Sequence, residues 1–375
     1  MDRIPLIDLE VQHAPFRLQL EAAATRVLAS NSFILGGEVA AFEVELARTL
    51  GVQHAVGVSS GTDALLALLA AVGVAPGDEV VTTPYSFFAT VEAIVRLGAR
   101  PVFADVDAAT LNVDPDRALE RIGPRTRAIL VVHLFGRMAQ TAALEAACAR
   151  NGVALVEDAA QAVGASRIDG GVRRGVGTLG SGAALSFFPT KNLGGFGDGG
   201  MVLTEDAGIA ERIRTLRNHG AAEKHQHSRI GGNFRLDEIQ AALLRVKLPH
   251  LVRWTEARIR LVHAYRRLLV GLPLRLPPAD EGCVWNQFVV GVPDGSRAAL
   301  MAFLESEGIA SAIYYPTPLH LQPALAGMSA GRPGDFPVAE QAARESLALP
   351  IHPELTDAQL ARVVSIIGRF FRQSL

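Results

Sequence analysis

The sequence predicts an α/β protein, with a large domain built on a mostly parallel sheet flanked by helices and a smaller C-terminal α+β domain. Three observations support this class. Short β-branched runs alternate with helical patterns between residues 54 and 220, as parallel strands joined by crossover helices require. The alternation of strand and helix patterns changes after about residue 250, and a chain of 375 residues is long enough to form two domains. With 49% hydrophobic and 20% charged residues, the composition is that of a folded, soluble protein.

The first part of the chain supplies the alternating elements. Apolar runs bounded by turn residues predict strands, and apolar residues spaced three or four apart predict the helices between them. The expected strands span residues 54–59, 79–83, 101–105, 128–134 and 153–157. The expected helices span residues 62–72, 89–97, 115–122 and 141–151. Two further strands, 183–188 and 201–204, are joined by a glycine-rich loop, and this loop holds the most unusual residues of the chain.

The second part begins with a long helical pattern from Asp237 to about Tyr265, interrupted at Pro249. It is followed by a predicted strand, helix, strand and terminal helix at residues 287–292, 298–307, 310–315 and 357–371. We therefore expect a large domain over residues 1–250, including an N-terminal arm, and a small domain over residues 251–375.

Charge and cysteine usage exclude several classes of function. Lys plus Arg is 36 and Asp plus Glu is 38, so a net charge of -2 provides no basic field for nucleic acid. Cys148 and Cys283 have no neighbouring Cys or His, which argues against zinc and against a disulfide framework. The first residues lack the pattern of a secretory signal, and no apolar run approaches the roughly 20 residues that span a bilayer. We expect a cytoplasmic protein that binds neither membrane nor metal.

Two stretches, residues 175–180 and 195–200, match the dinucleotide fingerprint G-x-G-x-x-G. The fingerprint binds a pyrophosphate only where it joins a strand to a helix. Each of these stretches is followed by a strand-like run, so they do not indicate an NAD site.

A better phosphate site lies where the strand at 54–59 runs into the helix at 62–72. Gly61 allows the backbone to approach an anion, Thr62 offers a hydroxyl, and the helix N-terminus supplies free N–H groups. An ordinary N-cap is the alternative, because Ser, Thr and Asp are favoured at that position in any case. This segment alone does not decide between the two.

An acid and a lysine complete the pattern. Asp158 follows the C-terminal end of a buried strand, where open α/β sheets bind ligands. The chain has three lysines, and Lys191 stands among glycines and apolar residues after a strand, where burial would lower its pKa. Lys224 and Lys247 lie in a polar segment and on the amphipathic connector, so both are expected to be solvated. Phosphate anchor, carboxylate and lysine are together what pyridoxal 5'-phosphate requires.

At these motifs the sequence resembles the nucleotide-sugar aminotransferases of the DegT/StrS type, within the fold-type-I pyridoxal-phosphate enzymes. The resemblance runs almost end to end and rests on residues 60–65, 76–80, 156–161, 186–200, 217–220, 233–240, 315–320 and 334–337. It implies that Lys191 is the Schiff-base lysine and proton carrier and that Asp158 is the partner of the pyridinium nitrogen. It places Gln161 near the phenolic oxygen and Phe87 on the ring, although Phe87 can also be a core aromatic.

The remaining cofactor contacts implied by the resemblance concern the phosphate. Gly61, Thr62 and Ser186 are expected to bind it. Asn233 is expected to reach the cofactor phosphate of a neighbouring subunit, which implies a homodimer with shared active sites.

The resemblance further implies ping-pong transamination. L-glutamate would give its amino group to the cofactor, leaving pyridoxamine phosphate, and the group would then pass to a keto group of a nucleotide-linked hexose. The segment 285–288 favours a 3-keto over a 4-keto sugar. Tyr315 and His320 are candidate substrate contacts, although His320 can also cap or pack locally.

Residues that depart from the family lie where relatives meet their sugar, namely Arg137, Asn286 and Tyr314. Two alternatives to the aminotransferase remain. A catalytically silent regulatory or scaffold protein of the same fold would be indicated by loss of Lys191 or Asp158, and both are present. A desulfurase would need a mobile catalytic cysteine, and neither cysteine lies in a glycine-rich loop.

Overall fold

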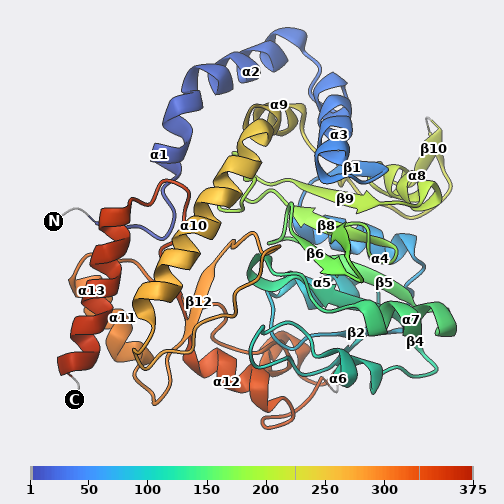
Figure 1. The fold of residues 1–375 in the computed structure, drawn as a ribbon. Coiled ribbons are helices and arrows are strands. Elements are labelled where there is room, and N and C mark those ends of the chain that lie inside the picture. The colour runs from blue at the N-terminus through green and yellow to red at the C-terminus, as the bar shows by residue number, and fades with distance from the viewer. Residues whose placement is uncertain (1–2, 224, 329, 374–375) are drawn as a thin grey trace.

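The computed structural model describes residues 3–223, 225–328 and 330–373, which form a large sheet covered by helices and a smaller C-terminal part (Figure 1). The N-terminal and large parts contain α1 (Leu9–His13), η1 (Ala14–Phe16), α2 (Arg17–Ser30), α3 (Gly37–Leu50), β1 (His54–Val58), α4 (Gly61–Ala71), β2 (Glu79–Thr82), α5 (Ala89–Arg96), β3 (Arg100–Phe103), α6 (Pro115–Leu119), β4 (Thr126–Val132), η2 (Leu134–Gly136), α7 (Ala142–Asn151), β5 (Ala154–Asp158), β6 (Ser166–Asp169), β7 (Val172–Gly175), β8 (Gly182–Ser186), β9 (Gly200–Thr204), α8 (Ala207–Leu216), β10 (Ala221–Glu223) and β11 (Gln226–His227). The rest of the chain contains α9 (Glu238–Lys247), η3 (Leu248–His250), α10 (Leu251–Leu269), β12 (Phe288–Gly291), α11 (Arg297–Ser306), η4 (Leu319–Leu321), η5 (Pro323–Leu325), α12 (Pro337–Glu345), β13 (Ser346–Leu349) and α13 (Asp357–Gln373).

The large sheet has seven strands in the order β1-β9-β8-β5-β4-β2-β3. β9 runs antiparallel to both of its neighbours, whereas β8, β5, β4, β2 and β3 are parallel to one another. The α/β class and the mostly parallel sheet predicted from the alternating pattern are therefore confirmed. As predicted, each G-x-G-x-x-G stretch is followed by a strand, β8 or β9, and neither opens the helix that a dinucleotide fingerprint needs.

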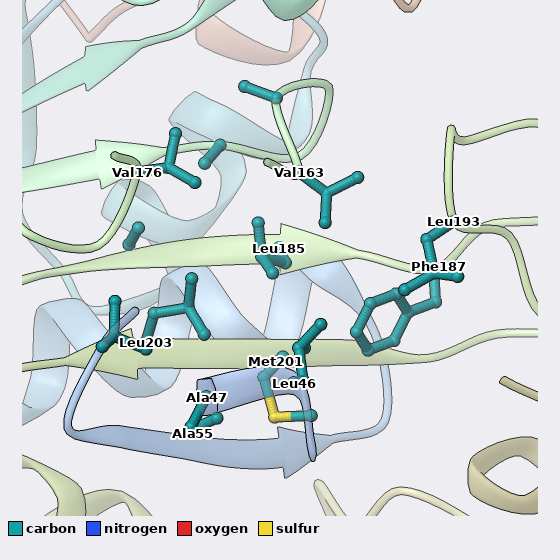
Figure 2. Close-up of a cluster of buried hydrophobic side chains, with 14 of the residues drawn as sticks. Leu46, Ala47, Ala55, Val163, Val176, Leu185, Phe187, Leu193, Met201 and Leu203 are labelled. Carbon is teal, nitrogen blue, oxygen red and sulfur yellow. The ribbon is translucent and has the colours of Figure 1, made fainter. Parts of the chain in front are cut away.

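Hydrophobic side chains hold helices against both faces of this sheet. On one face, Phe42 and Leu46 of α3 belong to a buried cluster with Leu185 of β8 and Met201 of β9 (Figure 2). On the other face, α4 contributes a buried row that includes Leu65. Strands covered on both faces need near-continuous apolar runs, which explains why these runs were readable in the sequence.

The N-terminal arm is helical, and it covers residues from distant parts of the chain. Helices α2 and α3 both pack against α9. Further upstream, Ile4 forms a parallel bridge with Ile309 and joins the hydrophobic cluster of the C-terminal part. The arm therefore contacts both parts of the molecule, and a domain boundary near residue 250 stays a prediction.

The connector and three of the four predicted C-terminal elements are present, whereas α12 and β13 were not predicted. α9 and α10 are separated by a single 3-10 turn that contains Pro249, as expected. The strand predicted at 310–315 is wrong, because only Ala312 pairs, in an isolated bridge with Ala348 of β13. β13 itself is the antiparallel partner of β12, and Pro316 and Pro318 cannot donate the hydrogen bonds that a longer strand would need.

Within the described ranges, no helix combines the length and the hydropathy needed to cross a membrane. The same part of the chain contains no group of three or more His, Cys, Asp or Glu side chains placed to hold a metal ion.

Candidate active site

Three of the predicted site residues, Gly61, Asp158 and Ser186, lie at the C-terminal edge of the sheet. β1, β5 and β8 point the same way, because β1 and β8 are both antiparallel to β9 and β5 is parallel to β8. Asp158 ends β5, Ser186 ends β8, and Gly61 begins the helix that follows β1. Side chains far apart in sequence therefore share one edge, as the rule for open α/β sheets predicts.

Asp158 is buried, with 5% of its surface exposed. Its Oδ2 accepts a hydrogen bond of 2.8 Å from the Thr90 hydroxyl, and its Oδ1 accepts one of 3.2 Å from the Ala160 N–H. Burial raises the pKa of Asp158, while the Thr90 bond and the nearby Lys191 oppose the rise. A cationic partner for this carboxylate would therefore be strongly stabilised.

Lys191 lies in the loop between β8 and β9. Burial lowers its pKa to about 8, and the charge of Asp158 opposes this shift. The lowered pKa predicted from its surroundings is confirmed. Two buried apolar side chains on either side, Phe187 and Leu193, lie in the hydrophobic cluster shown in Figure 2 and anchor the loop. The loop therefore presents a readily deprotonated amine from a fixed backbone.

A tight glycine contact lies where the anion site is predicted. A Cβ added at Gly61 would lie 2.7 Å from the Ser186 Cβ, so only glycine lets the start of α4 approach the end of β8 this closely. Thr62 follows in the first turn of α4, where N–H groups and the helix dipole favour an anion. Ser60 also caps the helix, since its side chain accepts from the Asp63 N–H at 3.1 Å. The capping role is therefore observed, and the anion site stays a prediction.

Gln161 links the sheet edge to the C-terminal part. Its Oε1 accepts from the Phe135 N–H at 2.6 Å, and its Nε2 donates to the Tyr315 hydroxyl at 2.9 Å. Tyr85 extends this link, because its hydroxyl donates to the Tyr314 carbonyl at 2.6 Å and accepts from the Tyr315 N–H at 2.9 Å. Burial raises the pKa of Tyr315, so its hydroxyl stays neutral at ordinary pH.

Phe87 and Asn233 are both exposed. Phe87 has 59% of its surface accessible, so it is not a core aromatic, and its ring centroid lies 6.2 Å from that of Tyr315. Asn233 pairs through its backbone with Asn218 in an isolated bridge. The exposure of Asn233 is compatible with a contact to a second subunit, which stays a prediction.

His320 packs between Phe103, which ends β3, and Phe336. Its side chain is buried, with Nε2 at 3.3 Å from the Glu340 Oε1 and its ring centroid 4.7 Å from that of Phe336. This is the local packing that the sequence analysis gave as the alternative to a substrate contact. The substrate contact itself stays a prediction.

The prediction that Lys247 is a solvated charge is wrong. Only 1% of its surface is exposed, and its ammonium lies 3.0 Å from the His13 Nε2. The amphipathic pattern of α9 suggested one buried face, but the N-terminal helices cover a second face of this helix. Lys224, for which the same prediction was made, lies outside the described residues.

Two of the residues that depart from the family, Arg137 and Asn286, are buried and bind other side chains. Arg137 donates to the Asp280 Oδ2 at 2.9 Å and stacks over the Trp285 ring at 5.2 Å. Asn286 donates from its Nδ2 to the Oδ1 of Asn192, the neighbour of Lys191, at 2.9 Å. A substitution of Asn286 would therefore remove a hydrogen bond to the loop that carries Lys191.

Sequence reasoning missed Tyr85 and Thr90, which contact Tyr315 and Asp158. A signal for them was present. Both residues follow β2, a parallel strand of the same sheet, so the rule that selected Asp158 also applies to them.

Comparisons with known proteins agree with this geometry. Residues 17–368 match the DegT/DnrJ/EryC1/StrS aminotransferase family. The chain is 44% identical over 374 residues to the "Pleiotropic regulatory protein" of Geobacillus stearothermophilus, covering 98% of this chain and 99% of that protein. It is 43% identical over 368 residues to the UDP-N-acetyl-3-dehydro-alpha-D-glucosamine 3-aminotransferase of Acidithiobacillus ferrooxidans, covering 98% and 97% of the two chains. The crystal structure of S. venezuelae DesV in complex with a ketimine intermediate superimposes with a TM-score of 0.94 at 42% identity, over 99% of both chains.

Proposed function

Because the chain belongs to the DegT/DnrJ/EryC1/StrS aminotransferase family, we propose that it moves the amino group of L-glutamate to the 3-keto group of a nucleotide-linked hexose. The family, the aminotransferase fold and the use of pyridoxal 5'-phosphate, all predicted from the motifs, are thereby confirmed. The observation that carries the proposal is the pairing of Lys191, whose pKa is lowered, with the buried carboxylate of Asp158 beside a glycine-built anion site.

The residues present fit the cofactor. The phosphate would lie at the start of α4, held by Gly61, Thr62 and Ser186, where the close glycine contact leaves backbone N–H groups accessible. The ring nitrogen would face Asp158, whose burial favours a bound cation. When bound, the cofactor supplies an aldehyde for the amino donor and an electron-withdrawing ring.

Each protein group then has a defined task. Lys191, neutral above a pKa of about 8, would accept a proton at Nζ from the donor α-carbon and deliver it to the cofactor carbon that keeps the amino group, acting first as general base and then as general acid. Asp158 keeps the ring nitrogen protonated through its carboxylate, and the Thr90 hydroxyl holds that carboxylate in place. Gln161 and Tyr315 orient the phenolic edge through their mutual hydrogen bond.

The sugar and subunit assignments rest on the name of a relative and on the exposure of Asn233. The Acidithiobacillus relative is named for a 3-dehydro sugar, which supports the 3-keto position. Exposed Asn233 supports a homodimer in which each subunit completes the other's phosphate site. A regulatory protein of this fold is the alternative, and the name of the Geobacillus relative favours it. The presence of both Lys191 and Asp158 favours the enzyme.

The experiment follows the two half-reactions separately. The purified protein, loaded with pyridoxal 5'-phosphate, is mixed with L-glutamate, and one 2-oxoglutarate per chain is expected. A panel of UDP- and dTDP-linked 3-keto and 4-keto hexoses is then added, and the amino sugar is identified by mass spectrometry. Lys191→Ala is the control and should produce neither product.

Three outcomes contradict the proposal in different ways. Absence of 2-oxoglutarate from a loaded protein refutes L-glutamate as the donor. Amination of 4-keto sugars alone refutes the 3-keto assignment. A folded protein that does not bind the cofactor favours the regulatory alternative.

A further inference from the structure

Lys247 contacts the loop that carries Lys191. Its buried ammonium donates a hydrogen bond of 2.5 Å to the carbonyl of Gly194, three residues after Lys191. The same ammonium lies 5.3 Å from the ring centroid of Phe196, in cation–π contact. A buried lysine that binds a backbone carbonyl and an aromatic ring of one loop restrains that loop at two positions.

Gln240 binds the same loop from the same helix. Its Oε1 accepts a hydrogen bond of 2.8 Å from the Phe196 N–H. Gln240 and Lys247 are seven residues apart on α9, so they lie on one face, two turns from each other. The loop is therefore attached to α9 through both a donor and an acceptor of its backbone.

The N-terminal arm completes this contact. His13, at the end of α1, has its Nε2 at 3.0 Å from the Lys247 ammonium, and its ring centroid lies 4.6 Å from that of Phe196. Burial, reinforced by the Lys247 charge, lowers the pKa of His13 to about 4, so the imidazole is neutral and accepts the hydrogen bond. Asn192, on the other side of the loop, donates to the Val284 carbonyl at 2.8 Å.

We propose that Lys247 and Gln240 are positioning residues that hold the loop from Lys191 to Phe196 against α9 and so set the environment of the Lys191 amine. The inference rests on the proposed function, in which Lys191 carries the chemistry. The attachment explains why a second lysine is buried here. Its ammonium meets a carbonyl, an imidazole and an aromatic ring, and these replace water as its partners.

The test measures the amine of Lys191 in the cofactor-free protein. Trace labelling with acetic anhydride over a range of pH, followed by mass spectrometry of the Lys191 peptide, reports the pH at which this amine becomes neutral. In the parent protein the midpoint should lie near 8. In Lys247→Met the loop loses its attachment, the amine gains water, and the midpoint should rise by about one unit towards the ordinary value of 10.5.

Gln240 provides a matched pair. Gln240→Leu removes the acceptor for the Phe196 N–H and should shift the Lys191 midpoint in the same direction. Gln240→Asn keeps a neutral amide oxygen on this face of α9 and should leave the midpoint closer to that of the parent than Gln240→Leu does. A second measurement, the dissociation constant for pyridoxal 5'-phosphate, should rise about tenfold in Lys247→Met, as expected for one lost charge-assisted contact, and by less in Gln240→Leu, which loses a hydrogen bond between neutral groups.

Folded Lys247→Met and Gln240→Leu proteins with the parent midpoint and the parent cofactor affinity would overturn the proposal. Should Lys247→Met fail to fold, a Gln240→Leu midpoint equal to that of the parent would overturn it as well. The labelling needs no turnover. A failure of the proposed function therefore appears as a parent protein without transamination, and a failure of the positioning role appears as an unchanged midpoint.

Discussion

Replacing Gly61 by alanine tests the anion site most directly. The added Cβ would lie 2.7 Å from the Ser186 Cβ and 3.3 Å from the Ser186 Cα. Neither atom is the end of a flexible side chain, so the start of α4 and the end of β8 must separate by roughly 1 Å to restore carbon contacts of about 3.5–4.0 Å. Such overpacking typically destabilises a folded protein by about 1–3 kcal/mol.

The larger effect is expected on the cofactor. Separation of α4 from β8 removes at least one hydrogen bond to the phosphate, and bonds to charged groups are worth about 1.5–3 kcal/mol. The dissociation constant for pyridoxal 5'-phosphate should therefore rise by about 10-fold to about 150-fold. Titration of the cofactor-free protein, followed by visible absorbance, measures this change.

Gly37→Ala is the matched control. Gly37 is also the first residue of an α-helix, but a Cβ there meets nothing within 4 Å. Both substitutions change the helix propensity in the same way, so only the steric contact with Ser186 distinguishes them. Equal cofactor affinities for the two variants would refute the argument that Gly61 shapes a phosphate site.

Two further predictions concern the charged groups of the site. Asp158→Asn should lower the single-turnover rate of 2-oxoglutarate formation by at least about 100-fold, because a neutral amide does not hold the ring nitrogen protonated; full activity in a folded variant would refute the role of this carboxylate. The rate of pyridoxal 5'-phosphate uptake by the cofactor-free protein should increase as the pH rises through about 8, since Lys191 attacks as the neutral amine that exists above its pKa; stopped-flow absorbance that gives a midpoint near 10.5 would contradict the lowered pKa.

The sequence by itself determined the elements whose signals are local. Strands buried on both faces are continuous apolar runs, and the helices between them have apolar residues on one side, so both were readable without tertiary information. The same holds for Gly61, Asp158 and Lys191, because each stands where a strand ends or a helix begins. Because ligands bind at the C-terminal edge of such a sheet, these three residues could be assigned to one site from the sequence.

Only the tertiary structure decided which distant segments cover these elements. The sequence did not show that Lys247 is buried beneath the N-terminal arm, that β12 pairs with β13, or that His320 packs beside Phe336. Nor did it show that the Thr90 hydroxyl binds Asp158. The physical reason is common to all four. Burial of a polar side chain and pairing of a strand edge depend on the groups that reach them from elsewhere in the chain, and no local pattern specifies those groups.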